Sequence, residues 1–190
     1  MGRYSTSETS LYVQYGDWLA RNWANISFYE TPKIAVRETG SRIVATLDSD
    51  QRYLLSSLYS VSPRLAGEPH SLPYLLGIIN SLMATWFERV IALDPTQGAF
   101  TKFRTNQLAR LPIRPMDSSD PADVARHDRM VGLVESMLDL HKRLPAATMQ
   151  TDRDLLQRQI TATDKQIDAL VYELYGLTEE EVGIVEGSSA

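Results

Sequence analysis

The chain has 190 residues, enough to bury a hydrophobic core, and a net charge of -5. It has no cysteine, which excludes disulfide bonds and thiolate metal sites, and it has neither an apolar run of membrane-spanning length nor a signal-like start. We therefore expect a soluble intracellular protein. The charge is uneven: residues 1–115 hold 12 Lys plus Arg against 9 Asp plus Glu, while residues 116–190 hold 7 Lys plus Arg against 15 Asp plus Glu. The first part of the chain is thus mildly basic and the second part acidic.

Two strands are predicted in the first part of the chain. Residues 33–39 alternate apolar and charged side chains, and residues 42–47 continue the β pattern after a Gly-Ser turn, so the pair predicts a hairpin. One face of the first strand carries Ile34 and Val36, and we expect the opposite face, with Lys33, Ala35 and Arg37, to be solvated. Arg37 and Arg42 flank the turn. On pattern alone, these cations are typical of a solvated strand edge.

A buried helix is predicted in the middle of the chain. Residues 50–61 favour a core strand and residues 62–73 a connecting loop. From Leu75 to Val90, apolar side chains recur every three or four positions, which is the period of a helix face packed on a core. Asp94-Pro95 should end that helix, since proline disfavours a helical conformation in the residue before it.

The segment after this helix, residues 98–106, interleaves aromatic and cationic side chains. It contains Phe100, Lys102, Phe103 and Arg104 beside hydroxyl and amide groups, a combination suited to a polyanion. An ordinary hairpin with solvated charges explains the same pattern. If the segment does contact a polyanion, we expect its two phenylalanines to pin it to the core.

The last 75 residues predict two long helices. Ser119 or Asp120 can cap the first, with Pro121 in its first turn, and residues 145–148 separate it from the second. Apolar residues in each step by three and four, as in a coiled coil, so we expect an antiparallel hairpin. Gly176 can close the second helix, and Thr178 with Glu181 predicts a capping box for a short third one. The hairpin could dock a partner or fold back to complete the core.

Five short motifs carry a family resemblance. They are LLGIINS at residues 75–81, G-x-F-x-K-F at 98–103, QLARLPI at 107–113, PKI-x-x-R at 32–37 and Y-x-LYGLT-x-EE at 172–181. Together they resemble the C-terminal specificity domain of TaqI-type N6-adenine DNA methyltransferases, which also occurs in the fused Type IIG restriction enzymes. The resemblance implies an α+β fold: a β-rich target-recognition domain with a buried central helix at residues 1–115, followed by an antiparallel α-helical hairpin with a short C-terminal helix at residues 116–190.

The resemblance also implies a function. It predicts a sequence-specific DNA recognition module in the prokaryotic cytoplasm, with double-stranded DNA and the methyltransferase or endonuclease part of the same restriction-modification system as partners. The predicted DNA-contacting residues are Lys33, Arg37, Arg42, Thr101, Lys102, Arg104, Asn106 and Arg110. The alternative is a protein-interaction module that acts through the acidic hairpin.

We expect no catalysis and no cofactor in this chain. Residues 94–97, Asp-Pro-Thr-Gln, share two residues with the Asn/Asp-Pro-Pro-aromatic motif that holds a flipped adenine, but lack its second proline and its aromatic. Asp48 and Asp50 near Arg52 form the nearest nuclease-like cluster and are more typical of a turn. The histidines, His70, His127 and His141, lack metal-site spacing. S-adenosylmethionine, and Mg²⁺ if a nuclease is fused, would belong to the catalytic part of the parent enzyme.

Overall fold

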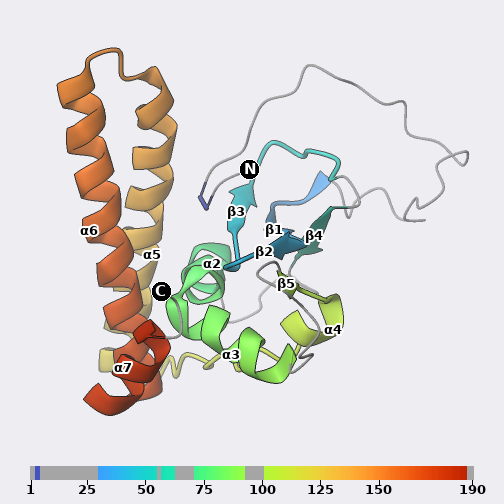
Figure 1. The fold of residues 1–190 in the computed structure, drawn as a ribbon. Helices are drawn as coiled ribbons and strands as arrows, with labels where there is room; N and C mark the ends of the chain where they lie inside the picture. Colours follow the sequence, from blue (N-terminus) through green and yellow to red (C-terminus); the bar gives the residue numbers. More distant parts are fainter. Residues whose placement is uncertain (1–2, 5–29, 55–56, 63–70, 93–100, 188–190) are drawn as a thin grey trace, which may run out of the picture.

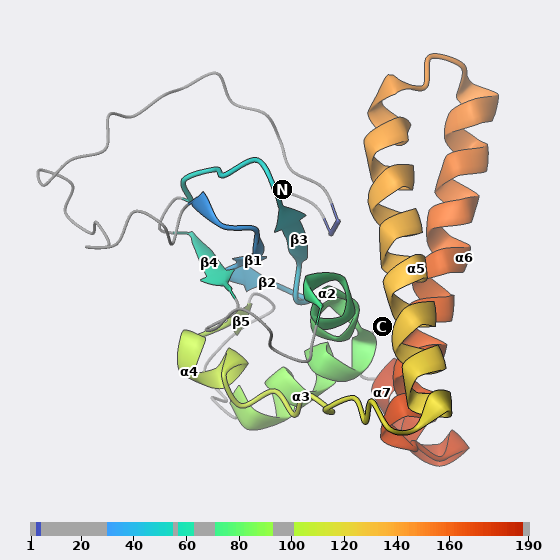
Figure 2. The same ribbon diagram turned by 180° about the vertical axis from the view of Figure 1, so that it is seen from behind.

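The computed structural model describes residues 3–4, 30–54, 57–62, 71–92 and 101–187, and its ribbon is drawn from two sides in Figures 1 and 2. The strands are β1 (Lys33–Arg37), β2 (Thr39–Gly40), β3 (Ala45–Asp48), β4 (Leu58–Val61) and β5 (Thr101–Lys102). The helices are α2 (Leu72–Asn80), α3 (Leu82–Ala92), α4 (Thr105–Leu108), α5 (Pro121–Arg143), α6 (Gln150–Tyr175) and α7 (Glu179–Gly187), with a 3-10 turn at Leu144–Ala146. The α+β class is confirmed.

The described strands form a small antiparallel sheet and a two-stranded ribbon. In the sheet the order is β3-β1-β4, with Ile34 opposite Leu47 on one side and Val61 on the other. The predicted pairing of the first two strands is therefore confirmed, although the connection between them is longer than a two-residue turn. Part of that connection is β2, which pairs with β5 from far along the chain.

The expectation that one face of β1 is solvated is wrong. Ala35 on that face is as buried as Ile34 and Val36 on the other, so side chains on both faces of β1 are covered. β1 is also the central strand of its sheet. Lys33 is 1% exposed, and its ammonium lies 2.7 Å from a carboxylate oxygen of Asp48, its partner in the strand register. A buried cation needs such a partner, since an unpaired charge away from water is costly.

The single helix predicted from Leu75 to Val90 is two helices in the structure. Ser81 separates them in an extended conformation, with φ -66° and ψ 158°. Its hydroxyl donates to the Ile78 carbonyl at 2.7 Å and accepts from the Ala84 N–H at 3.1 Å, so it serves both helix ends. The free N–H of Leu82 donates to the Asp168 carboxylate of α6 at 2.8 Å. The break is therefore held by a tertiary contact.

The two long helices form the predicted antiparallel hairpin, and the hairpin folds back on α2. The side chains buried along it include most of the apolar positions that step by three and four: Met130, Val134, Met137, Leu140, Leu156, Ile160, Ile167, Leu170 and Leu174. Gly77 of α2 lies where a Cβ would be 2.4 Å from Met130 Sδ and 3.1 Å from Val134 Cγ2. The absent side chain therefore lets α2 and α5 approach closely.

The predicted helix caps are present. Asp120 caps α5 by accepting from the Ala122 N–H at 2.9 Å, and Pro121 is its first residue. Gly176 ends α6 in the left-handed conformation, with φ 65°. Thr178 and Glu181 exchange hydrogen bonds of 2.8 and 3.3 Å as a capping box for α7.

The elements stack in layers. The sheet lies on one side of α2, and the hairpin lies on the other, with α7 beside α3 (Figures 1 and 2). Buried side chains of the sheet, α2, α3 and the hairpin form one continuous hydrophobic core. Among the helices that the structure describes, none combines the length and apolar character needed to cross a membrane.

Candidate nucleic-acid interface

The β2–β5 ribbon brings the first predicted hairpin and the basic segment together. Thr39 pairs with Lys102 and Gly40 with Thr101, and the Phe103 N–H donates to the Glu38 carbonyl at 2.8 Å. In both views β2, β5 and α4 lie on the side of the molecule away from α5 and α6 (Figures 1 and 2). Residues about 65 positions apart in the chain, near 38 and near 103, thus share one surface.

A buried aromatic side chain anchors this ribbon. Phe103 is 1% exposed and belongs to the core, as expected for a residue that pins the segment to the domain. The other predicted anchor, Phe100, lies outside the described residues, as does the start of the segment, and the Thr101 side chain is not described. The anchoring leaves the residues on either side of Phe103 at the surface.

Three predicted DNA-contacting side chains are exposed around α4: Arg104, Asn106 and Arg110. Arg104 directly precedes the helix, and its N–H donates to Gln107 Oε1 at 2.9 Å. This bond satisfies an N–H at the helix start and fixes the backbone from which the arginine projects. The segment closes on Leu111, which is 8% exposed. With Lys102 and Arg37, these side chains form what we call the basic edge.

Arg37 is held close to the β2 backbone. Its Nε donates to the Thr39 carbonyl at 2.8 Å, and a Cβ on Gly40 would lie 2.8 Å from Arg37 Nη2. The same Cβ would lie 2.9 Å from the Arg42 carbonyl oxygen, a backbone atom that cannot turn aside as a side chain can, so glycine fits this position. The side chain is half-buried and its orientation is fixed by the turn, unlike a solvated charge on a strand edge.

Lys102 is paired with an acid that was absent from the sequence-based predictions. Its Nζ lies 2.9 Å from Glu38 Oε1, with 56% of the lysine side chain and 21% of the glutamate side chain exposed. The same carboxylate oxygen accepts from the Tyr59 hydroxyl at 2.9 Å. Burial, and then the bond to Glu38, raise the pKa of Tyr59. Glu38 lies just after β1, outside the alternation of apolar and charged residues in that strand, so the sequence pattern gave no indication of its role.

The other two predicted DNA-contacting residues, Lys33 and Arg42, lie outside the basic edge. Lys33 is buried beside Asp48 as described above. Arg42 is half-buried on the side of α6, where burial and the positive charge of Arg3 lower its pKa and the carboxylates of Asp164 and Asp168 oppose the shift. The turn therefore separates Arg37 from Arg42 rather than placing them on one surface.

A buried carboxyl group lies on α3. Glu88 has no exposed surface, and both of its carboxylate oxygens lack a hydrogen-bond partner within the described part of the chain. Burial raises its pKa to about 7, and the charge of Arg110 opposes this shift. Since an isolated buried carboxylate is costly, the proton is retained close to neutral pH.

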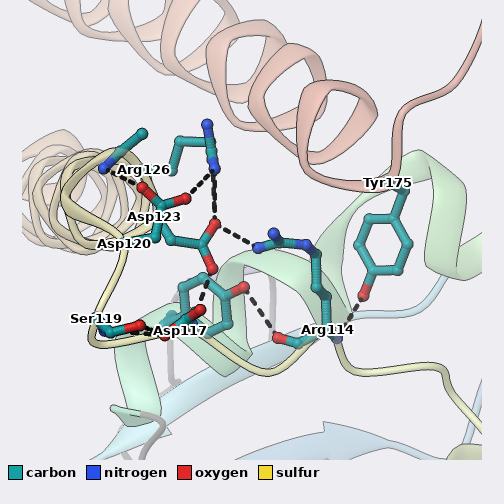
Figure 3. A network of polar contacts seen from close by, with 9 residues as sticks. Arg114, Asp117, Ser119, Asp120, Asp123, Arg126 and Tyr175 are labelled. Carbon is teal, nitrogen blue, oxygen red and sulfur yellow. Dashed lines mark hydrogen bonds and ion pairs between the residues drawn. The ribbon is translucent and has the colours of Figure 1, made fainter.

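The basic edge and the hairpin are joined through a polar junction (Figure 3). Asp123 of α5 is its centre: it accepts from Arg114 Nη1 at 2.6 Å, from Arg126 Nη2 at 2.8 Å and from the Asp117 N–H at 2.8 Å. These bonds, led by the one from Asp117, hold the pKa of Asp123 far below its usual range. Tyr175 of α6 accepts from the Arg114 N–H at 3.3 Å and donates to the Pro112 carbonyl. Side chains of both long helices therefore bind the segment that follows α4.

The acids near Arg52 form a turn, as the sequence suggested. Asp48 accepts from the Asp50 and Arg52 N–H groups at 3.2 and 2.9 Å, and it also pairs with the Arg52 guanidinium. Within the described ranges, no three His, Asp or Glu side chains gather in a group that could hold a metal ion.

Comparison with known protein families gives one match. A model of the TaqI-like C-terminal specificity domain matches residues 1–113, which include the sheet, α2, α3 and the basic edge. No curated protein matches the chain.

Proposed function

The chain belongs to the family of TaqI-like C-terminal specificity domains, and from that membership we propose that it reads a short sequence in duplex DNA for an N6-adenine DNA methyltransferase of a restriction-modification system. The family implies DNA target recognition. The observation that supports this role here is the basic edge, where exposed Lys102, Arg104 and Asn106 surround a buried anchor, Phe103.

The side chains of the basic edge suit distinct tasks. Arginine presents a planar fork that can bind the O6 and N7 atoms of guanine together, and asparagine can bind adenine in the same two-bond manner. Lysine acts as a point charge and suits a phosphate. We therefore propose that Arg104 reads a base edge, that Lys102 binds a phosphate, and that Arg37, Asn106 and Arg110 extend the contact. Thr101 stays in the proposal as a residue of the same strand.

The charge of the chain supports recognition rather than strong binding. Residues 1–115 carry only three more cations than acids. Because non-specific affinity rises with the number of phosphates neutralised, this excess suits a module that adds sequence selection to a complex anchored elsewhere. We propose that residues 1–115 form the recognition domain and that the acidic hairpin of residues 116–190, which points away from the basic edge, contacts the catalytic part.

Members of this family are typically the non-catalytic part of their enzymes. We propose accordingly that methyl transfer, with S-adenosylmethionine as donor, and any Mg²⁺-dependent cleavage by a fused Type IIG nuclease occur in the parent enzyme. The contribution of this chain is to select the site at which that chemistry takes place.

One observation favours the alternative of a protein-interaction module. At the free end of the hairpin, Met149 is 63% and Leu155 is 52% exposed. Single exposed apolar side chains are common on protein surfaces, but two of them six positions apart at the end of the hairpin offer an apolar contact for a partner. This role is compatible with DNA recognition if the partner is the catalytic part.

The deciding experiment is a binding titration of the 190-residue chain with fluorescent random-sequence duplexes at 50 and 200 mM salt. We expect weak binding that falls steeply with salt, because each phosphate contact releases a counterion. A selection from a random duplex library, followed by sequencing, should then yield a short preferred motif. Absence of duplex binding at low salt would favour the alternative.

A further inference from the structure

We infer that Glu38 is a specificity-determining residue at the basic edge. Its ion pair with Lys102 keeps the lysine from binding DNA phosphates in general, and the lysine leaves this pair only for a phosphate placed at one fixed position. This inference deepens the proposed function and rests on it. It begins from the geometry at Glu38 Oε1, which lies 2.9 Å from both Lys102 Nζ and the Tyr59 hydroxyl.

Glu38 is held in place from several sides. Its N–H donates to the Ser57 carbonyl at 2.9 Å, and its carbonyl accepts from the Phe103 N–H at 2.8 Å. Its side chain is bound to Tyr59 of β4, and 21% of it is exposed. The carboxylate therefore has a fixed position, whereas the Lys102 side chain is 56% exposed and carries its charge at the end of a flexible chain.

The difference in exposure determines which partner moves. An ion pair with an exposed lysine adds little stability, since water competes for both charges. A phosphate can therefore take Lys102 from Glu38 at small cost. The carboxylate stays behind, however, and repels any phosphate that approaches it in another position. DNA bound loosely, in many registers, meets this repulsion without the full benefit of the lysine.

The consequence is a lower affinity for non-specific DNA. A protein that searches a genome has to distinguish its site from a great excess of other sequences, so a device that weakens loose binding raises selectivity even without a base contact. The fixed acid beside a mobile cation supplies such a device. Tyr59 contributes by keeping the carboxylate oriented toward Lys102.

The test compares Glu38→Gln with a matched control in the 190-residue chain. Glutamine keeps an oxygen that can accept from Tyr59 but removes the charge. The control is Asp139→Asn, which removes the same charge from an exposed pair with Arg143 at 3.3 Å on the hairpin. Both variants change the net charge equally. Thermal unfolding establishes that each is folded, and Glu38→Asp serves as the conservative rescue.

We expect Glu38→Gln to bind random-sequence duplexes several-fold more tightly and to steepen the salt dependence by about 0.9 in log–log slope, the value of one added phosphate contact. Its preference for the selected motif over random duplex should fall. Asp139→Asn should change neither quantity to that extent, and Glu38→Asp should restore wild-type behaviour. In a Lys102→Ala background, the gain from Glu38→Gln should be smaller, because the part that comes from releasing the lysine is absent.

Two outcomes would overturn the inference while leaving the proposed function intact. One is that the wild-type chain binds duplex DNA and that Glu38→Gln changes this binding no more than Asp139→Asn does. The other is an equal gain from Glu38→Gln with and without Lys102, which would show that the acid acts only as a distant charge. Absence of duplex binding by the wild-type chain at low salt would instead count against the proposed function, and this inference would fall with it.

Discussion

The side-chain amide of Asn80 forms two hydrogen bonds with the backbone of Ala45. Asn80 Oδ1 accepts from the Ala45 N–H at 2.9 Å, and Asn80 Nδ2 donates to the Ala45 carbonyl at 3.0 Å. Asn80 has no exposed surface. The last residue of α2 therefore binds β3 as another strand would, and it fixes the central helix to the sheet that carries the basic edge.

Replacing Asn80 by alanine should destabilise the fold by about 2 to 4 kcal/mol. The substitution leaves a buried N–H unpaired and weakens the bonding of the carbonyl, and each buried unpaired group costs roughly 1 to 3 kcal/mol. Urea denaturation of wild type and variant measures the difference. Asn106→Ala, at an exposed position, is the control and should lie within about 0.5 kcal/mol of wild type. A similarly small loss for Asn80→Ala would contradict the clamp.

Glu88 should make the fold less stable as pH rises. Its pKa is 4.5 in its ordinary environment and about 7 in the folded protein, so between these values the folded state binds the proton and the unfolded state does not. The stabilisation that protonated Glu88 contributes to the fold is fully present below about pH 4.5 and is lost as the pH rises to about 7. We expect a loss on the order of 1 to 3 kcal/mol.

Glu88→Gln isolates this contribution, because a neutral amide cannot titrate. Burial raises the pKa of Asp168 to about 6, so part of the pH dependence remains in both proteins and cancels in their difference. Denaturation of each at pH 4.5, 6 and 8 should show wild type losing stability relative to the variant over this range. Glu135→Gln, at an exposed position of α5, is the control. Parallel curves for wild type and Glu88→Gln would refute the assignment.

Asp123 should have the opposite dependence. Hydrogen bonds from Asp117, Arg114 and Arg126 lower its pKa, so the stability that it contributes is present above about pH 4, the ordinary value for the group, and is lost as pH falls below it. Asp123→Asn should therefore be less stable than wild type at neutral pH, and the gap should narrow between pH 4 and pH 2. A gap that is constant with pH would mean that the junction depends on shape rather than charge.

The sequence predicted those elements whose causes are local. The caps at Asp120, Gly176 and Thr178 follow from residue types at fixed offsets, and the hairpin follows from a regular apolar period. The helix break at Ser81 was missed because it depends on a bond from Leu82 to Asp168, 86 residues further along the chain. The motif LLGIINS gave the family, but its physical content became clear only in three dimensions: close approach at Gly77, a clamp at Asn80 and a break at Ser81.

The candidate site was predicted in part for a similar reason. The segment around Phe103 combines its signals within a few residues, so its anchor and its exposed cations could be recognised. Lys33 has the pattern of a solvated strand charge, and only the register that sets it opposite Asp48 explains its burial. Glu38 gave no signal, because it lies between β1 and β2 while its partners Tyr59 and Lys102 come from β4 and β5.

Lys102→Ala should weaken binding to the selected duplex and to its single-mismatch variants about equally. A lysine that binds a phosphate carries no sequence information, so its loss should lower the log–log salt slope by about 1 and leave the preference among these duplexes unchanged. Titrations of the selected duplex and of single-mismatch duplexes at two salt concentrations measure both quantities. Lys142→Ala, an exposed cation on the hairpin, is the matched control and should leave the slope unchanged. A change in sequence preference on loss of Lys102 would assign it to a base.

Arg104→Ala should instead relax selectivity. Arg104 is exposed beside the buried Phe103, and the bond from its N–H to Gln107 at 2.9 Å fixes the backbone from which it projects. A two-bond contact to guanine from such a position should be worth roughly 1 to 3 kcal/mol at one base pair. In the complex with the methyltransferase part, the variant should lose that amount on the cognate duplex.

A set of single-mismatch duplexes tests this assignment. On the duplex in which the base pair read by Arg104 is changed, the variant should bind about as tightly as wild type does. Discrimination at that base pair should therefore disappear, while discrimination at the other pairs persists. Arg104→Lys is the informative comparison, because it keeps the charge without the fork and should restore the salt slope but not the discrimination. If Arg104→Ala keeps wild-type discrimination at every pair while remaining folded, Arg104 is not a base-reading residue, and Arg37, held over Gly40 on the same edge, becomes the next residue to test.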